Sequence, residues 1–273
     1  MLAFAANSLL CRLALGQELI DAASFASARV VSGAVFLTLI VLPRWKVSGR
    51  QATDWRAVFA LFAYMASFSF AYLSLAAGTG ALILFGAVQL TMFIVALRNG
   101  EHFAMLSWCG LALAISGLVW LVSPGVTAPD RVGAALMAIA GIAWCAYSLL
   151  GRGHADPLQA TANNFIYCVP LVLIVSAIFI KDFHFTTVGL GVAVASGTIA
   201  SGLGYVIWYA ALPGLTATRA ATVQLSVPAI AALGGALWLS EEITLRLLLA
   251  SAATLGGVWI VLAQRSRSAA ESA

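Results

Sequence analysis

Two groups of mostly aromatic side chains recur at four-residue intervals in this sequence. They are Tyr64, Phe68 and Tyr72 in one segment, and Ser201, Tyr205 and Tyr209 in another. Residues four apart share one face of a helix, so each group would form a stripe that either packs between helices or encloses an apolar ligand. Tyr64, Phe68 and Tyr205 lie deepest in their segments and are candidate substrate-binding residues. Tyr72 and Tyr209 fit an aromatic belt at a membrane surface.

Uncharged polar residues also occur in the middle of apolar stretches. Asn7, Gln89 and Gln224 are candidates for binding the polar part of a solute, because an amide that faces lipid without a partner is costly. Hydrogen bonding between helices is the alternative explanation for them. Trp144 and Tyr147 are further candidates for lining the same site.

Arg29 is a cation well inside an apolar stretch. Its long side chain could extend to the nearer membrane surface, as arginine commonly does near the end of a span. Alternatively, it lines a cavity and contacts the carboxylate of a solute. The sequence leaves both interpretations open.

The apolar stretches lack the groups that perform acid–base, nucleophilic or metal chemistry. The 3 histidines and 10 acidic residues fall in polar connectors, at the ends of apolar stretches or in the tail. The cysteines are far apart, which is typical of packing residues: Cys11, Cys109, Cys145 and Cys168. We therefore predict no catalytic residue, no metal site, no cofactor, and no proton coupling through a buried acid.

The composition is that of a membrane protein. Of the 273 residues, 62% are hydrophobic and 9% are charged, whereas soluble domains carry about a quarter charged residues. The mean hydropathy is +1.01. The net charge of +4 follows from Lys and Arg in the loops, so nucleic acid is not an expected partner.

Apolar runs separated by short polar connectors predict an all-α membrane protein with about ten transmembrane helices. The predicted spans are residues 2–15, 24–42, 57–76, 81–97, 105–122, 132–150, 158–180, 188–212, 217–239 and 245–263. The first span is shorter than most of the others, and a signal peptide is the alternative for it.

The two halves of the sequence resemble each other. AFAANSLLCR, which begins at Ala3, aligns with AWCAYSLLGR, which begins 140 residues later at Ala143. The same shift relates Glu101 to Glu241, and a charged match is a rare event in so apolar a chain. We therefore predict two five-helix repeats, residues 1–135 and 136–273, around a central cavity.

Because five is an odd number, the second repeat must cross the membrane with opposite polarity to the first. This inverted topology is common in secondary transporters, where two similar halves expose a central site to each side in turn. Lys and Arg are concentrated in the connectors that follow even-numbered spans and in the tail. That bias predicts that both termini are cytoplasmic.

Two features predict helix movement. Small residues occupy every fourth position at Gly189, Ala193, Gly197 and Ser201, a pattern of close helix packing. Pro228 should kink the ninth span because it removes a backbone hydrogen bond. We expect Gly197, Ser201 and Pro228 to act in gating, with tight packing alone as the alternative for the small residues.

The sequence resembles the drug/metabolite transporter superfamily, in particular its ten-helix EamA-type members. The resemblance rests on YAALPGLTATRAATVQLSVPAIAALGGALWLSEEIT from Tyr209 and its looser echo YLSLAAGTGALILFGAVQLTMFIVALRNGEHF from Tyr72. Pro228 and Glu241 fit the family pattern, whereas Val88 stands where the first copy would have a proline. The start of the chain and the aromatic helices are similar to the aromatic amino-acid exporter branch, which is also linked to lipophilic cation efflux.

The resemblance implies a basket of ten helices around a central cavity in a bacterial inner membrane. We predict a secondary-type exporter or facilitator for neutral, aromatic or hydrophobic amino acids. Efflux of drugs, lipophilic cations or other small metabolites is the alternative, and a membrane-embedded enzyme or sensor is the alternative outside transport. The expected partners are a small-molecule solute and the lipid bilayer, and the chain would act as a monomer.

Overall fold

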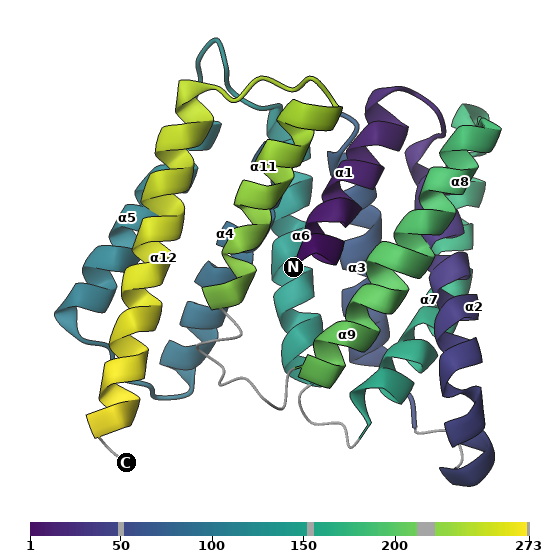
Figure 1. Cartoon of the computed structure of the whole chain (residues 1–273), viewed down its shortest axis with the longest axis horizontal. Coiled ribbons are helices and arrows are strands. Elements are labelled where there is room, and N and C mark those ends of the chain that lie inside the picture. Colours follow the sequence, from purple (N-terminus) through teal and green to yellow (C-terminus); the bar gives the residue numbers. More distant parts are fainter. Residues whose placement is uncertain (49–51, 152–155, 212–221, 272–273) are drawn as a thin grey trace.

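The computed structural model describes residues 1–48, 52–151, 156–211 and 222–271, which form a bundle of helices (Figure 1). The helices are α1 (Leu2–Gly16), α2 (Ala22–Ser48), α3 (Trp55–Ala71), α4 (Ala77–Arg98), α5 (Met105–Val122), α6 (Arg131–Gly151), α7 (Pro157–Ile178), η1 (Ile180–Asp182), α8 (Thr187–Ala195), η2 (Ser196–Leu203), α9 (Gly204–Ala211), α11 (Ser226–Trp238) and α12 (Leu245–Glu271). Within these residues, β-type pairing is limited to an isolated bridge between Ile20 and Phe185.

The helices agree with the predicted spans. Among the described residues, 7 helices are long and apolar enough to cross a membrane. Shorter apolar helices occupy the first, third and ninth predicted spans, at Leu2–Gly16, Trp55–Ala71 and Thr222–Trp238. Many large apolar side chains face outward, which suits lipid rather than water. The predicted fold class, an all-α membrane protein, is confirmed.

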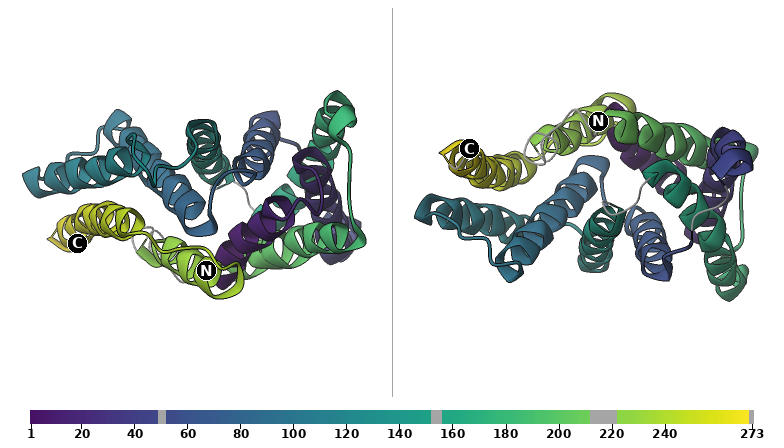
Figure 2. Two further views of the ribbon diagram at one scale, coloured as in Figure 1. Left: turned by 90° about the horizontal axis from the view of Figure 1, so that it is seen from above. Right: turned by 90° about the horizontal axis from the view of Figure 1, so that it is seen from below.

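The helices form two layers (Figure 2). One layer contains α5, α4, α6, α3 and α7, and the other contains α12, α11, α1, α8 with α9, and α2. The layers pack against each other where α5 meets α12, where α4 meets α11 and where α2 meets α7. Each layer therefore combines helices from both halves of the sequence.

Matching helix contacts occur in the two layers. α3 packs on α6 and α7, just as α8 and η2 pack on α1 and α2. α4 packs on α6, just as α11 packs on α1. The helices of the first half thus make the same contacts with the second half as their repeat partners make with the first. Inverted repeats are expected to show this correspondence.

Carboxylates in the connectors begin two of the helices. Asp54 caps α3 by accepting a hydrogen bond from the Arg56 N–H at 2.9 Å, and Asp156 caps α7 by accepting from two N–H groups of its first turn, both at 3.1 Å. Burial alone would raise the pKa of each carboxyl, but these hydrogen bonds and the adjacent Arg56 or Arg44 lower both pKa values below the usual one. These acids therefore stabilise helix starts.

The eighth predicted span is helical but changes type in its middle. α8 runs into the π-helical segment η2, which continues as α9. Hydrogen bonds in a π-helix join residues five apart, so Ser196 and Ser201 come to face similar directions. The sequence analysis predicted one uniform helix here, because small residues at four-residue spacing also fit an α-helix.

Candidate functional site

A group of side chains meets between the two layers, and we call it the central cluster. Its members are Phe4, Asn7, Arg29, Tyr64, Phe68, Trp144, Ser196, Ser201 and Tyr205. Phe4 is partly buried, and the other members are buried. They come from α1, α2, α3, α6, η2 and α9, so both layers and both halves of the sequence contribute.

Arg29 lies at the centre of this cluster and is 0% exposed. Its Nε donates to the Ser201 hydroxyl oxygen and its Nη2 to the Tyr64 hydroxyl oxygen, both at 3.2 Å. Its guanidinium carbon lies 4.9 Å from the centroid of the Phe68 ring and 5.4 Å from that of Tyr64. The interpretation in which Arg29 extends to the membrane surface is therefore wrong, because α2 directs the side chain into the space between the layers.

No carboxylate in the described part of the chain pairs with the charge of Arg29. Within the described residues, its hydrogen bonds go to hydroxyl groups and its Nη1 has no hydrogen-bond partner. None of the ion pairs in the same residues includes it. Burying an unpaired cation costs several kcal/mol, and each contact with an aromatic face offsets about 2 kcal/mol of that cost at a desolvated site. An anion bound next to Arg29 would balance this positive charge.

Asn7 extends the hydrogen-bonded group from α2 and α3 to α1. Its Nδ2 donates to the Tyr64 hydroxyl oxygen at 3.4 Å, and its Oδ1 accepts from the Ser196 hydroxyl at 2.6 Å. The Tyr64 oxygen therefore accepts from both Asn7 and Arg29. One phenol group thus connects α1, α2 and α3 at the middle of the bundle.

Aromatic rings surround these polar groups. Trp144 of α6 stacks on Tyr205 of α9 with ring centroids 5.5 Å apart, and its ring lies 5.0 Å from that of Tyr64. Phe4 of α1 packs edge-on against Trp144 at 6.1 Å. Trp144 belongs to one layer and Tyr205 and Phe4 to the other, so the rings bridge the two layers.

The structure brings most of the predicted solute-binding residues together. Those in the central cluster are Asn7, Arg29, Tyr64, Phe68, Trp144 and Tyr205. Tyr147 adjoins Trp144, with ring centroids 5.8 Å apart, and its hydroxyl donates to Thr161 at 3.2 Å. Gln89 of α4 and Gln224, which precedes α11, are buried outside the cluster. The buried Nε2 of Gln89 has no hydrogen-bond partner among the residues that the structure describes.

The predicted gating residues lie where helices approach closely or break. At Gly197 a β-carbon would collide with the carbonyl oxygen of Arg29, so η2 packs directly on α2. Pro228 is buried near the start of α11, and the helical segment from Thr222 is interrupted at Leu225. Proline has no backbone N–H, so it cannot donate the hydrogen bond to the carbonyl four residues earlier, and this loss accounts for the interruption. The gating role of Gly197, Ser201 and Pro228 stays a prediction.

At one end of the bundle, a set of contacts joins the two halves of the sequence. We call it the Arg12 latch; it consists of Arg12, Glu241 and backbone groups of Tyr72, Leu73 and Ala77. Arg12 Nε donates to Glu241 Oε1 at 3.1 Å, and its Nη1 donates to the carbonyls of Tyr72 and Leu73. The N–H of Ala77, which begins α4, donates to the other Glu241 oxygen at 2.8 Å. We call this end, at the top of Figure 1, the latch end.

The latch is not among the features predicted from the sequence. Arg12 ends the repeated segment AFAANSLLCR and Glu241 is the repeat partner of Glu101, and charged residues that recur in so apolar a chain are the signal that could have indicated it. Tyr72, predicted as a belt residue, is instead 0% exposed, and its hydroxyl donates to the Ala77 carbonyl at 3.3 Å. The side chain of Tyr209, the other predicted belt residue, lies outside the described part of the chain.

A second contact at the latch end lies between the connectors that follow α1 and α7. The Asp21 N–H donates to the His184 carbonyl at 3.1 Å, and the Thr186 N–H donates to the Leu19 carbonyl at 2.7 Å. Together with the Arg12 latch, these hydrogen bonds tie the two layers at this end. The two backbone hydrogen bonds thus hold these connectors together at the latch end.

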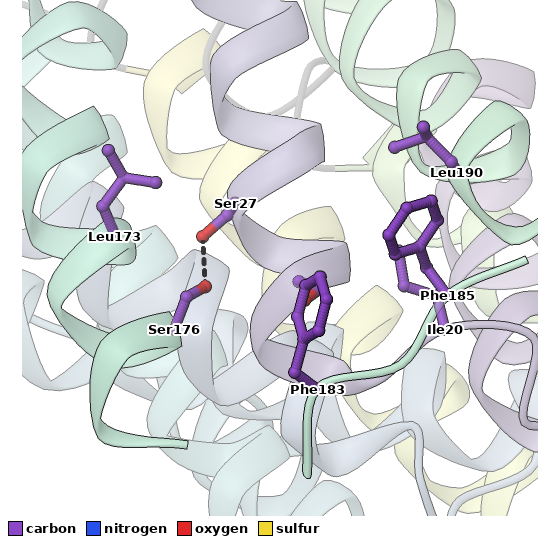
Figure 3. A pocket seen from close by; sticks show the side chains of 8 residues that line it. Ile20, Ser27, Leu173, Ser176, Phe183, Phe185 and Leu190 are labelled. Carbon is purple, nitrogen blue, oxygen red and sulfur yellow. Dashed lines mark hydrogen bonds between the residues drawn. The ribbon is translucent and has the colours of Figure 1, made fainter. Parts of the chain in front are cut away.

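A hollow of about 250 Å³ lies beside these connectors, between α2, α7 and α8 (Figure 3). It is lined by Ile20, Ser24, Ser27, Leu173, Ser176, Phe183, Phe185 and Leu190. The Ser27 and Ser176 hydroxyls bond to each other at 2.8 Å. The hollow shares no residue with the central cluster and has no charged side chain in its lining, so we do not treat it as the solute site.

The central cluster offers one positive charge, amide and hydroxyl hydrogen bonds, and aromatic faces. Among the residues that the structure describes, no three His, Cys, Asp or Glu side chains are grouped so that they could hold a metal ion. The arrangement can therefore bind and orient an organic solute, with Arg29 as its electrostatic centre.

Comparison with known proteins identifies related sequences. Residues 131–263, which begin at the first residue of α6, match the EamA-like transporter family. An uncharacterized protein of Pseudomonas aeruginosa is 48% identical, and the alignment covers 100% of this chain and 96% of that protein. An uncharacterized transporter of Archaeoglobus fulgidus is 25% identical over 86% of each chain.

The fold also occurs in a solved structure. A crystal structure of another protein superimposes with a TM-score of 0.67 and covers 96% of this chain and 97% of its own. At 18% sequence identity, this likeness concerns the fold alone.

Proposed function

We propose that this multi-pass membrane transporter, whose residues 131–263 match the EamA-like transporter family, carries neutral aromatic or hydrophobic amino acids. The central cluster is the proposed binding site. Transport is of the secondary type, either export or facilitated passage, with the solute exposed to each side of the membrane in turn.

The observation that carries this proposal is the buried, unpaired Arg29 with aromatic rings around it. Its free Nη1 can donate to a carboxylate, and an ionic hydrogen bond in a dry site is stronger than one between neutral groups. Trp144 and Tyr205 offer apolar faces within reach of the same point. A carboxylate next to an aromatic or aliphatic side chain fits this combination.

The remaining predicted residues have supporting roles in the proposal. Tyr64 and Asn7 hold Arg29 in place and present hydroxyl and amide groups to the solute. Phe68 and Tyr147 extend the aromatic wall in the two directions along the bundle. Gln89 and Gln224 lie outside the cluster, where they would contact a solute on its way to or from Arg29.

Alternating access in this proposal uses two inverted repeats, residues 1–135 and 136–273. The matched contacts of the two layers support that division. In the conformation described, the Arg12 latch ties the halves together at the latch end, so its opening would expose the central cluster to that side. Gly197, Ser201 and Pro228 would allow η2 and α11 to move relative to α2 and α4.

We propose that the protein lies in a bacterial inner membrane with both termini in the cytoplasm. The end opposite the latch carries Arg44, Lys46, Arg56 and Arg98, which border α2, α3 and α4. Positively charged connectors normally remain cytoplasmic. The latch end would then face the outside of the cell.

The proposal includes no proton coupling through a buried acid. In the described spans, the carboxylates near the bundle interior belong to helix caps or to the latch, and each is already hydrogen-bonded. Lipophilic cation efflux, the alternative substrate class, is disfavoured by the same geometry, because Arg29 would repel a cation entering the central cluster.

The test is flux measured with purified protein in proteoliposomes. We expect labelled phenylalanine to equilibrate across the membrane faster than in empty vesicles, while threonine, which lacks an apolar side chain, moves more slowly. A pH gradient should leave the final distribution of phenylalanine unchanged. Absence of amino-acid flux under every condition would contradict the proposal, and accumulation driven by the gradient would contradict its uncoupled mechanism.

A further inference from the structure

We propose that the central cluster recognises the carboxylate of its solute and not the ammonium group, so that an aromatic monocarboxylate without an amino group binds more tightly than the corresponding amino acid. The inference rests on the proposed function, because it assumes that the central cluster is the solute site. It adds to the proposed function that a monoanion with the same aromatic group binds this site more tightly than the zwitterionic amino acid.

The net charge of the central cluster favours an anionic solute. Arg29 contributes one positive charge to a buried site, and the described residues supply no carboxylate to it. A zwitterionic amino acid brings zero net charge, so the occupied site would keep its uncompensated cation. A monoanion cancels that charge, and the gain is large where water is excluded.

An ammonium group would need hydrogen-bond acceptors in the central cluster. The Tyr64 oxygen already accepts from Arg29 and Asn7, and the Ser201 oxygen accepts from Arg29. The Asn7 Oδ1 accepts from Ser196 at 2.6 Å. The Tyr64 oxygen therefore has both lone pairs in use, and the Ser201 and Asn7 oxygens each have one of two in use. These three oxygens leave two lone pairs for the three donors of an ammonium ion.

The carboxylate of Glu241, which could balance the charge of an ammonium group, belongs to the Arg12 latch instead. Glu241 bonds to Arg12 at 3.1 Å and to the Ala77 N–H at 2.8 Å, so both of its oxygens are occupied. Burying an ammonium group without such a partner costs free energy. The site therefore favours a solute that brings a carboxylate and an aromatic ring, with nothing cationic between them.

The first experiment measures binding to the purified full chain in detergent through the rise in its melting temperature. The ligands are phenylalanine, 3-phenylpropanoate, which lacks the ammonium group, and phenethylamine, which lacks the carboxylate. We expect apparent affinity to be at least about tenfold higher for 3-phenylpropanoate than for phenylalanine, as an added 1.4 kcal/mol would give. Phenethylamine should give no stabilisation.

The matched variants are Arg29→Gln and Arg98→Gln. Arg98 is exposed at the end of α4, so its replacement removes the same charge from a position outside the central cluster. Arg29→Gln should abolish stabilisation by 3-phenylpropanoate, and Arg98→Gln should retain it. Should Arg29→Gln fail to fold, the order of the three ligands on the wild-type protein still decides the question.

The second experiment asks whether unlabelled 3-phenylpropanoate or phenethylamine slows labelled phenylalanine flux in proteoliposomes. Inhibition by 3-phenylpropanoate alone supports the inference. Phenylalanine flux that resists 3-phenylpropanoate, or that phenethylamine inhibits equally, overturns the inference while the proposed function stands. No phenylalanine flux, together with stabilisation by 3-phenylpropanoate, rejects the amino-acid substrate and supports the preference for an anion.

Discussion

Arg29 and Arg12 both lie among hydrophobic helices, but they differ in whether a carboxylate of the described residues pairs with the guanidinium. Arg12 is paired with Glu241 at 3.1 Å and also donates to two backbone carbonyls, and its side chain is 25% exposed. Arg29 is 0% exposed and contacts hydroxyl groups and aromatic rings, with one nitrogen unpaired.

The difference separates a structural charge from a binding charge. A partner carboxylate makes Arg12 part of a tie between the two halves of the sequence. Arg29 has no such partner, so its charge can be balanced by a solute that binds and later dissociates. If this distinction is correct, giving Arg29 a partner and removing the partner of Arg12 should have different consequences.

The largest effect is expected when Arg29 receives an internal carboxylate. Ser201→Asp would place that group next to the guanidinium, because the Ser201 hydroxyl lies 3.2 Å from Arg29 Nε. The new pair would compete with the solute, so we expect phenylalanine flux to fall at least about tenfold. The melting temperature should hold or rise, since the buried cation is then neutralised.

The control is Ser201→Asn, which has nearly the same shape but no charge. It should lose less flux than Ser201→Asp. Equal flux in the two variants would show that the volume of the side chain matters and its charge does not, and it would remove the contrast between the two arginines.

The second effect concerns the partner of Arg12. Glu241→Gln removes the ion pair with Arg12 and leaves at most a hydrogen bond from the guanidinium to a neutral amide, and hydrogen bonds to charged groups contribute about 1.5–3 kcal/mol. Opening at the latch end should therefore be roughly tenfold more frequent. Cys11, which precedes Arg12 and is 0% exposed, should react faster with a membrane-impermeant thiol reagent.

The measurement uses protein in which Cys109, Cys145 and Cys168 are replaced by serine. Glu242→Gln is the matched control, because Glu242 is exposed beside the latch. Equal labelling of Cys11 in both variants would mean that the Arg12 latch does not restrain the latch end.

A smaller effect is expected from the aromatic wall that Arg29 has and Arg12 lacks. Trp144→Leu removes the indole ring, which is stacked on the Tyr205 ring and tilted against the Tyr64 ring. Each aromatic pair contributes about 0.5–1.5 kcal/mol beyond burial, so preference for phenylalanine over leucine should fall several-fold. Trp259→Leu on α12, where the side chain is 58% exposed, should leave the preference unchanged, and a loss in both variants would point to a general packing effect.

The smallest effect belongs to a third arginine, Arg44, which pairs with Asp156 at 3.0 Å and has a side chain 51% exposed. Asp156→Asn keeps a helix cap and loses the charge, so we expect a loss of stability below about 1 kcal/mol. Asp156→Ala also removes the cap and should cost about 1 kcal/mol more. Thermal unfolding of the two variants measures both contributions.

The pH dependence of that contribution follows from the pKa of Asp156, which is lowered in the folded protein. The stabilisation is complete above the unfolded value of about 3.9 and is lost as the pH falls through the lower folded pKa. The difference in melting temperature between wild type and Asp156→Asn should therefore stay constant from pH 8 to about pH 5 and shrink only in more acidic buffer. A difference that disappears near neutral pH would contradict the assignment.

The order of the helices could be predicted from the sequence because a membrane imposes a simple rule. Each crossing requires a long apolar run, and Pro, Gly and charges mark its ends. The predicted span 105–122 coincides with α5, and 2–15 nearly coincides with α1. Both depend only on residues that are close together in the chain.

Part of the site could also be predicted from local pattern. Tyr64 and Phe68 share a helical face, and Trp144 is conspicuous inside an apolar run, so all three were identified as candidates. Gln89 and Gln224 met the same criteria but lie outside the central cluster. A polar residue at mid-span is a necessary feature of such a site, and the sequence does not reveal which neighbour it faces.

The sequence by itself determined the apolar helices, their order along the chain, and the residue types available for binding. Only the tertiary structure decided that Arg29 points inward, that Ser196 and Ser201 face the same region through a π-helical turn, and that Arg12 pairs with Glu241. The physical reason is distance along the chain: Arg29 and Ser201 are 172 residues apart, and Arg12 and Glu241 are 229 apart. Whether a buried charge is paired or left for a ligand depends on contacts that exist only after the two halves have packed together.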